Sequence, residues 1–159
     1  MTPRDELDRA RAFFDGRISS EPKLTPTRKA ELLANADGRR CPTCSCKMRY
    51  LKGKMFGHEV SDAATVEHIA PNKMGGSNER RNLAVRCNLC NRASGHSINE
   101  WMQRRVNPTW EEICRVLNYL WLEVRDTSKA NELYPEFFAA FQRKRNLLKT
   151  KLAKREVRV

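Results

Sequence analysis

The sequence predicts an α+β fold that is mostly helical, with a small strand-containing centre enclosed by two pairs of cysteines. Two CxxC pairs, Cys41 with Cys44 and Cys87 with Cys90, enclose residues 45–86. Helical periodicity is missing from this central stretch, whereas capped amphipathic segments lie on both sides of it. The centre is therefore expected to consist of short strands and loops, and the flanking regions are expected to be helices.

Two helices are expected before the centre. Thr2-Pro3 opens the first, which runs to Phe14, because a proline at the first helical position loses no hydrogen bond. Thr25-Pro26 opens the second in the same way, and Gly38 ends it. Residues 1–40 are thus interpreted as an N-terminal helical extension that leads into the first cysteine pair.

Within the centre, two antiparallel strands joined by a long loop are expected. Residues 64–69 and 82–87 alternate roughly between polar and apolar side chains and are rich in β-branched residues. Gly75 and Gly76 permit the backbone angles of a loop between the two strands. A short helix is expected to begin near Cys90.

The region after the centre, residues 98–159, is expected to be helical. Residues 97–100 and 109–112 match capping boxes, and each predicts the start of a helix. The second of these helices carries an apolar stripe that includes Cys114, which is interpreted as a buried side chain and not as a metal ligand. One further helix follows residue 126. Its basic end is interpreted either as a solvated tail or as an arm on nucleic-acid phosphates.

Composition limits the location and the partners of the protein. Its 159 residues contain no run of about 18 apolar residues, so no transmembrane helix is expected. The charged N-terminus lacks the apolar stretch of a secretory signal, which predicts a reducing, cytoplasmic location. A net charge of +12 makes a polyanion the natural partner, although a solvated basic surface would have the same composition.

The six cysteines are better explained as metal ligands than as disulfides in a reducing compartment. Each CxxC allows two thiolates to bind one ion from a tight turn, and four sulfurs in a tetrahedron are a usual structural zinc site. The predicted zinc ligands are Cys41, Cys44, Cys87 and Cys90. The neighbouring Cys46 leaves open which sulfur of the first turn binds the ion.

In their order along the chain, the central motifs closely resemble the HNH endonucleases, whose catalytic unit is a ββα-metal fold. The matching motifs are the first CxxC, Glu67-His68-Ile69-Ala70-Pro71, Gly75-Gly76, Asn82-Leu83 and a second CxxC followed by Asn91. Residues 41–97 are therefore expected to form the nuclease core. In its length and basic character the chain is similar to small HNH proteins encoded by bacteriophages. A phage origin would place the protein in the host cytoplasm.

The resemblance implies a role for each matching residue. Glu67 and Asn91 would bind the catalytic metal ion, and His68 would be the general base. Asn82 would fix the loop and orient that histidine. The family often has a lysine where this chain has Ser94, so one expected cation is unaccounted for. For Asn91 the alternative is an ordinary helix cap.

Phosphodiester hydrolysis requires these residue types for chemical reasons as well. A cation must stabilise the charge on the phosphate and on the leaving oxygen, and the oxygen donors of Glu67 and Asn91 suit Mg²⁺ or Mn²⁺, with Ni²⁺ as a third option. An imidazole such as that of His68 exchanges protons near neutral pH and can activate water. Because neighbours on a strand point to opposite faces, Glu67 and His68 can serve one centre only if the strand ends or bulges there.

The predicted function is the endonucleolytic hydrolysis of DNA, with 5′-phosphate and 3′-hydroxyl products as the resemblance implies. The predicted nucleic-acid contacts are Lys73, Arg80, Arg81, Arg92 and His96. Two alternatives stay open: a zinc-containing module that binds DNA without cleaving it, and a nuclease subunit that needs a phage packaging or restriction partner. A homodimer or a terminase-type partner would be required if both strands are cut together.

Overall fold

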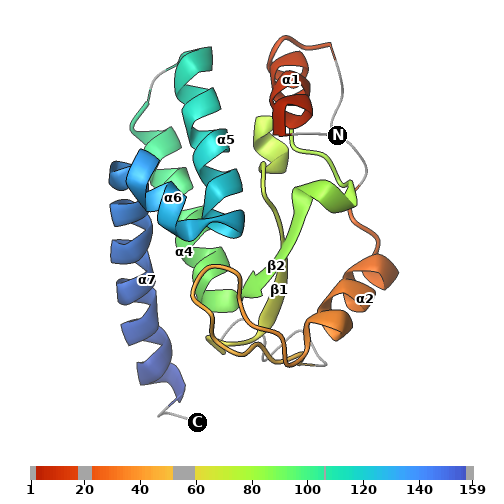
Figure 1. Ribbon diagram of the computed structural model, residues 1–159, viewed down its shortest axis with the longest axis vertical. Helices are drawn as coiled ribbons and strands as arrows, with labels where there is room; N and C mark the ends of the chain where they lie inside the picture. Colours follow the sequence, from red (N-terminus) through yellow and green to blue (C-terminus); the bar gives the residue numbers. More distant parts are fainter. Residues whose placement is uncertain (1–2, 18–22, 52–59, 106, 157–159) are drawn as a thin grey trace.

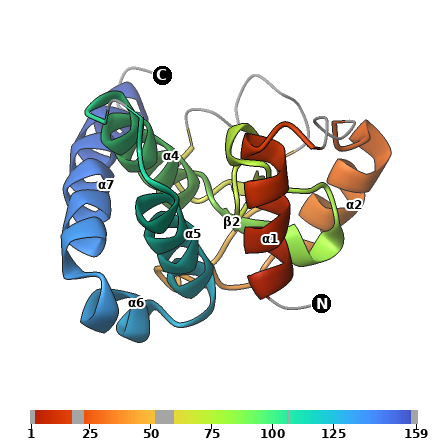
Figure 2. The same ribbon diagram turned by 90° about the horizontal axis from the view of Figure 1, so that it is seen from above.

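The computed structural model describes residues 3–17, 23–51, 60–105 and 107–156. Two short strands lie at its centre, with the helices α1 (Pro3–Phe14) and α2 (Pro26–Ala36) on one side and four C-terminal helices on the other (Figures 1 and 2). The mostly helical α+β fold predicted from the sequence is confirmed. None of the helices in the described ranges is both long and apolar enough to cross a membrane.

The strands β1 (Ala64–His68) and β2 (Leu83–Cys87) pair antiparallel, as the sequence predicted. The long loop between them contains two short 3-10 helices, η1 (Asn72–Met74) and η2 (Arg80–Asn82). His68 is the last residue of β1. Glu67 and His68 can serve one centre only if the strand ends or bulges beside them. Because β1 ends at His68, this requirement is met.

Gly76 lies in the most crowded part of the loop. A Cβ at this position would stand 1.7 Å from the Ala70 carbonyl oxygen and 2.8 Å from Asn82 Nδ2. We expect Gly76→Ala to lower the free energy of unfolding by about 2–3 kcal/mol, because the backbone must move to admit the methyl group. Gly95→Ala is the matched control, since a Cβ there would meet nothing within 4 Å apart from the backbone of its own helix. Urea unfolding measures both variants, and equal stabilities would contradict the expectation.

Helix α4 (Asn88–Gln103) follows β2 directly. The sequence predicted that a new helix starts behind Ser97, and this prediction is wrong because one helix continues through that residue. The Ser97 hydroxyl donates to the Ser94 carbonyl oxygen at 2.9 Å, so it bonds within the helix instead of capping a new one. Helix α7 (Pro135–Glu156) packs along α4 and favours the uninterrupted helix (Figure 1).

Helix α5 (Trp110–Arg125) begins at the predicted capping box, in which the Thr109 and Glu112 side chains each accept the other's backbone N–H. The prediction of a single helix after α5 is wrong. The structure has two helices there, α6 (Thr127–Leu133) and α7. The break follows from Pro135, which disfavours helical geometry in the preceding residue and is well suited to start a helix.

The two N-terminal helices follow the prediction. The Thr25 hydroxyl accepts the Arg28 N–H at 3.3 Å and caps α2, and Gly38 follows the end of that helix with φ +77°. Thr2, the predicted cap of α1, lies outside the described residues. Helix α2 packs on both strands, whereas α1 packs on α5 and on η1. One hydrophobic core joins these elements, so the strand pair is enclosed by helices from both ends of the chain.

Candidate functional site

Four sulfur atoms meet where β2 passes into α4. The Sγ atoms of Cys41, Cys44, Cys87 and Cys90 all lie within 4.8 Å of one another. Cys44 Sγ is 3.7 Å from Cys87 Sγ. Tetrahedral sulfurs around an ion with bonds of about 2.3 Å are roughly 3.8 Å apart, so the group has the dimensions of a zinc site. Cys46 is not in the group, and Cys44 is therefore the candidate ligand of its turn.

Local geometry prepares these cysteines to bind a metal ion. The Cys41 N–H donates to the Cys46 carbonyl oxygen at 2.8 Å, which closes the first turn, and the Cys90 N–H donates to Cys87 Sγ at 3.4 Å. Hydrogen bonds from the thiols of Cys41, Cys87 and Cys90 hold the pKa of Cys44 well below its usual range. Hydrogen bonds within the same group raise the pKa of Cys87 and Cys90, so without an ion the thiolate, which is the form that binds metal, is favoured on the first cysteine pair and disfavoured on the second.

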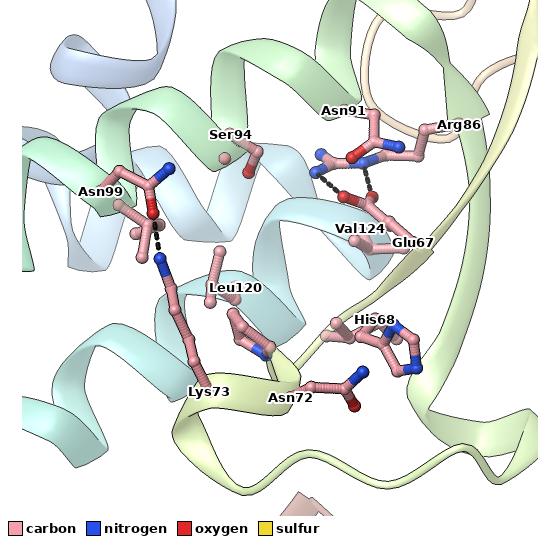
Figure 3. Close-up of a pocket in the computed structure, with 14 residues that line it drawn as sticks. Glu67, His68, Asn72, Lys73, Arg86, Asn91, Ser94, Asn99, Leu120 and Val124 are labelled. Carbon is pink, nitrogen blue, oxygen red and sulfur yellow. Dashed lines mark hydrogen bonds and ion pairs between the residues drawn. The ribbon is translucent and has the colours of Figure 1, made fainter. Parts of the chain in front are cut away.

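A cavity of about 290 Å³ opens between the end of β1 and helix α4 (Figure 3). Glu67 and His68 line it from the end of β1, and Asn91 lines it from the first turn of α4. The structure thus brings together three of the residues predicted to take part in the chemistry. They come from segments more than 20 residues apart in the sequence.

Glu67 is held in this cavity by a buried arginine. Arg86 Nη2 donates to Glu67 Oε2 at 3.0 Å, and Arg86 Nε donates to Oε1. Burial raises the pKa of Glu67, and the positive charge of Arg86 opposes that rise. Each carboxylate oxygen can accept more than one bond, so the arginine pair leaves lone pairs for an ion.

The sequence analysis did not single out Arg86. The available signal was a charged residue inside an otherwise apolar strand, directly before the zinc candidate Cys87. Arg86 also lines the cavity, where its positive charge pairs with Glu67. Ser94 itself lines the cavity and is buried.

His68 Nε2 lies 2.6 Å from Asn78 Oδ1. A carbonyl oxygen only accepts hydrogen bonds, so Nε2 carries the proton in this pair and Nδ1 is the basic nitrogen. The histidine is oriented directly by Asn78, a residue that the sequence analysis did not consider. Asn78 belongs to the loop between the strands, and its position depends on how that loop is held.

Buried Asn82 ties the two ends of that loop together. Its Oδ1 accepts the Ala70 N–H at 2.8 Å. Its Nδ2 donates to the carbonyl oxygens of Ala70 at 3.1 Å and Ser77 at 2.7 Å. Both N–H groups of the amide are used inside the protein. Asn82 therefore acts on the loop and not on a bound substrate, and it influences His68 through the chain that carries Asn78.

Thr65 determines which way the Asn91 amide faces. The Thr65 hydroxyl donates its only hydrogen to the Arg86 carbonyl oxygen at 2.9 Å. Toward Asn91 the same oxygen can only accept, and Asn91 Nδ2 donates to it at 3.0 Å. Asn91 Oδ1 must then face away from Thr65. The atom that could bind a metal ion is thus set by a hydrogen-bond chain from β1.

One of the five predicted nucleic-acid contacts lines the cavity, and two others lie on α4 outside its described lining. Lys73 lines it directly, and Arg92 and His96 lie on α4. Lys144 and Lys151 of α7 add positive charge near His96. Burial lowers the pKa of His96, and the charges of Arg92, Lys144 and Lys151 lower it further. Glu100, which pairs with Lys144, opposes these charges, so three cations and one carboxylate lie near His96.

The other two predicted contacts lie near η2. Arg81 pairs with Glu79 at 3.1 Å and with buried Glu6 of α1 at 3.3 Å, so its charge is used within the protein. Arg80 lines a second cavity, of about 550 Å³, whose described lining contains no carboxylate. The other arginines of that lining are Arg39, Arg40 and Arg125. The two cavities share Ile69 and Val124 as wall residues.

A family model described as HNH endonuclease matches residues 57–107. The match spans both strands, the loop and helix α4, and it contains Glu67, His68 and Asn91. The first CxxC and helix α5 lie outside it. No curated protein and no solved structure matches the chain. The matched family indicates nuclease activity in general, and the cavity lies within the matched segment.

Proposed function

Starting from the HNH endonuclease assignment of residues 57–107, we propose that this chain hydrolyses DNA phosphodiester bonds at the cavity lined by Glu67, His68 and Asn91. The observation that carries the proposal is the meeting of a carboxylate, an imidazole and an amide in one cavity at the end of β1. These three groups are the ones that metal-dependent hydrolysis requires.

Glu67 and Asn91 are the proposed ligands of the catalytic ion. Both offer oxygen donors, which fit Mg²⁺ or Mn²⁺ best and also accept Ni²⁺. When bound, such an ion supplies positive charge to the scissile phosphate and to the leaving 3′ oxygen. Asn91 presents Oδ1 because Thr65 holds its Nδ2, and Glu67 is held by Arg86.

His68 is the proposed general base. Its Nδ1 takes a proton from the attacking water, while Asn78 accepts the hydrogen bond from Nε2 and keeps the ring in place. The water oxygen bonds to phosphorus, the bond from phosphorus to the 3′ oxygen breaks, and the 3′ oxygen takes a proton from solvent water while His68 returns its proton to the solvent. The products are a 5′-phosphate and a 3′-hydroxyl.

A structural zinc ion in the four-cysteine cluster is the second part of the proposal. Four thiolate ligands leave no open position, so the zinc takes no part in the reaction. It ties the turn at Cys41 to the start of α4. Asn91 directly follows the ligand Cys90, so the zinc also fixes the position of the proposed catalytic ligand.

The basic surfaces on either side of the shared wall favour a polyanionic substrate. On one side is Lys73, and on the other is the arginine-lined cavity. Contacts of this kind bind backbone phosphates and position the strand without reading its sequence. They support DNA binding near the cavity, and a double-strand break would need a second copy or a second visit by the same site.

A plasmid cleavage assay with Mg²⁺, Mn²⁺, Ni²⁺ and Zn²⁺ tests the proposal. If the protein is a nuclease, we expect nicked plasmid circles with Mg²⁺, Mn²⁺ or Ni²⁺. The nicks should carry 5′-phosphate ends that a ligase can join. The rival function, a DNA-binding module, predicts salt-sensitive retention of the plasmid and no cleavage with any ion. Cleavage that requires an added phage partner would identify a subunit that is inactive alone.

Thr65→Val tests the proposed control of Asn91. Valine keeps the shape of the side chain but cannot accept the Asn91 Nδ2 hydrogen bond, so the amide is free to rotate away from the ion. We expect roughly tenfold weaker Mn²⁺ binding and a similar loss of cleavage at limiting Mn²⁺. Thr65→Ser keeps the hydroxyl and should behave like the wild type. Identical Mn²⁺ titrations for the valine and serine variants would contradict this role.

A further inference from the structure

Arg86 lies at the centre of a buried three-residue ion-pair network. It pairs with Glu67 on one side and with Glu123 of α5 on the other. Both Arg86 and Glu123 are almost fully buried, with exposed side-chain fractions of 1% and 0%. The Glu67 carboxylate faces the cavity, whereas Glu123 does not line it. The arginine therefore connects a proposed metal ligand to a carboxylate that an ion cannot reach.

The network holds one negative charge in excess, because two carboxylates share one guanidinium. Without Glu123, the positive charge of Arg86 would be matched by Glu67 alone, and the pair would present no net charge to a divalent ion. Glu123 Oε2 has no hydrogen-bond partner among the described residues. Burial and the charge of Glu123 raise the pKa of the neighbouring Tyr119 hydroxyl, so that group stays neutral and leaves the carboxylate charge in place.

Two further contacts hold Glu123 in place. The Ser94 hydroxyl of α4 donates to Glu123 Oε1 at 2.5 Å. The Thr43 hydroxyl donates to the Glu123 carbonyl oxygen at 3.1 Å and accepts from Arg86 Nη1 at 3.0 Å. Thr43 lies between the two cysteines of the first CxxC. The same network thus joins the zinc turn, helix α4 and helix α5 to the cavity.

We propose that Glu123 is a positioning residue for the catalytic ion: it binds the far side of Arg86, so that Arg86 orients the Glu67 carboxylate without neutralising it. This inference rests on the proposed function for the role of Glu67. It extends the working site beyond the matched segment, because Glu123 lies in α5, outside residues 57–107. A helix of the C-terminal region is then part of the metal site.

Glu123→Gln tests this role in the full-length, zinc-loaded protein. Glutamine has nearly the same shape and keeps an acceptor oxygen for Ser94 and Arg86, but it removes the excess charge. We expect Mn²⁺ binding, measured by electron paramagnetic resonance without DNA, to weaken by roughly 10- to 100-fold. Glu111→Gln is the matched control, because it removes the same charge from an exposed position on α5 and should leave Mn²⁺ affinity unchanged.

Cleavage kinetics separate positioning from general damage. In Glu123→Gln the Mn²⁺ concentration for half-maximal rate should rise, and saturating Mn²⁺ should restore the rate. Unchanged Mn²⁺ affinity in a folded, zinc-loaded Glu123→Gln protein would overturn the inference. If Glu123→Gln does not fold, Ser94→Ala is the second test. It removes the hydrogen bond to Glu123 Oε1 without removing charge, and we expect Mn²⁺ affinity to fall by about threefold or more. No loss there would overturn the inference as well.

These results can be told apart from failure of the nuclease proposal. Weaker Mn²⁺ binding in Glu123→Gln, together with a wild type that binds Mn²⁺ but never cleaves DNA, would support the role of Glu123 and reject the proposed activity. Cleavage by the wild type with equal Mn²⁺ affinity in both proteins would reject the role of Glu123 alone.

Discussion

His68→Ala should reduce metal-dependent plasmid nicking by a factor of about 10² to 10⁴. The structure leaves Nδ1 of this ring as the basic nitrogen, because Nε2 donates to Asn78. No other histidine lines the cavity within the described residues. Water is a poor nucleophile without a base, so the loss should fall on the rate at saturating metal and not on metal affinity.

The measurement is the initial rate of nicking at saturating Mn²⁺, together with zinc content and thermal unfolding of the same preparation. His58→Ala is the histidine control, because His58 is not part of the Glu67-His68 motif. His58 lies outside the described residues. Added imidazole should restore part of the activity of His68→Ala by supplying the missing base. Full residual cleavage by the variant would remove His68 from the mechanism.

Cys87→Ser should abolish zinc binding and unfold the centre of the protein. Apparent binding free energies of structural zinc in small peptides are about 10–16 kcal/mol, comparable with the whole stability of a typical domain, about 5–15 kcal/mol. Cys87 ends β2 and precedes α4, so its loss should release both elements. Zinc content by mass spectrometry and the loss of cooperative thermal unfolding measure the effect.

Cys46→Ser is the matched control for this experiment. Cys46 lies two residues after Cys44 but outside the group of four sulfurs, so the variant should keep one zinc per chain and unfold at nearly the wild-type temperature. Zinc loss in Cys46→Ser with retention in Cys44→Ser would reverse the ligand assignment. A fully folded Cys87→Ser protein without zinc would show that the cluster does not stabilise the centre.

Local signals predicted most of the secondary structure correctly. Thr25 caps α2 and Thr109 caps α5, because a hydroxyl beside free backbone N–H groups is a signal that acts within one turn. The failures have a different cause. The same pattern at Ser97 does not cap a helix, since packing of α4 against α7 keeps the helix intact. A local pattern cannot show which of two helical arrangements the rest of the protein favours.

The candidate site shows the same division. The two CxxC pairs were recognisable from spacing alone, and the structure brings those four sulfurs together. The partners of the site residues were not predictable: Asn78 orients His68, and Thr65 orients Asn91. Both contacts join segments ten or more residues apart, and neither residue type has a spacing that marks it.

The sequence by itself determined the types of chemistry available to this protein: thiolates for a closed metal site, oxygen donors and an imidazole for hydrolysis, and excess positive charge for a polyanion. Only the tertiary structure decided how those groups are held and balanced. Arg86 and Glu123 lie 37 residues apart and meet in the interior, where low polarity makes each buried charge depend on its partner. That pairing joins β2 to α5 through two side chains, and no local pattern in the sequence encodes it.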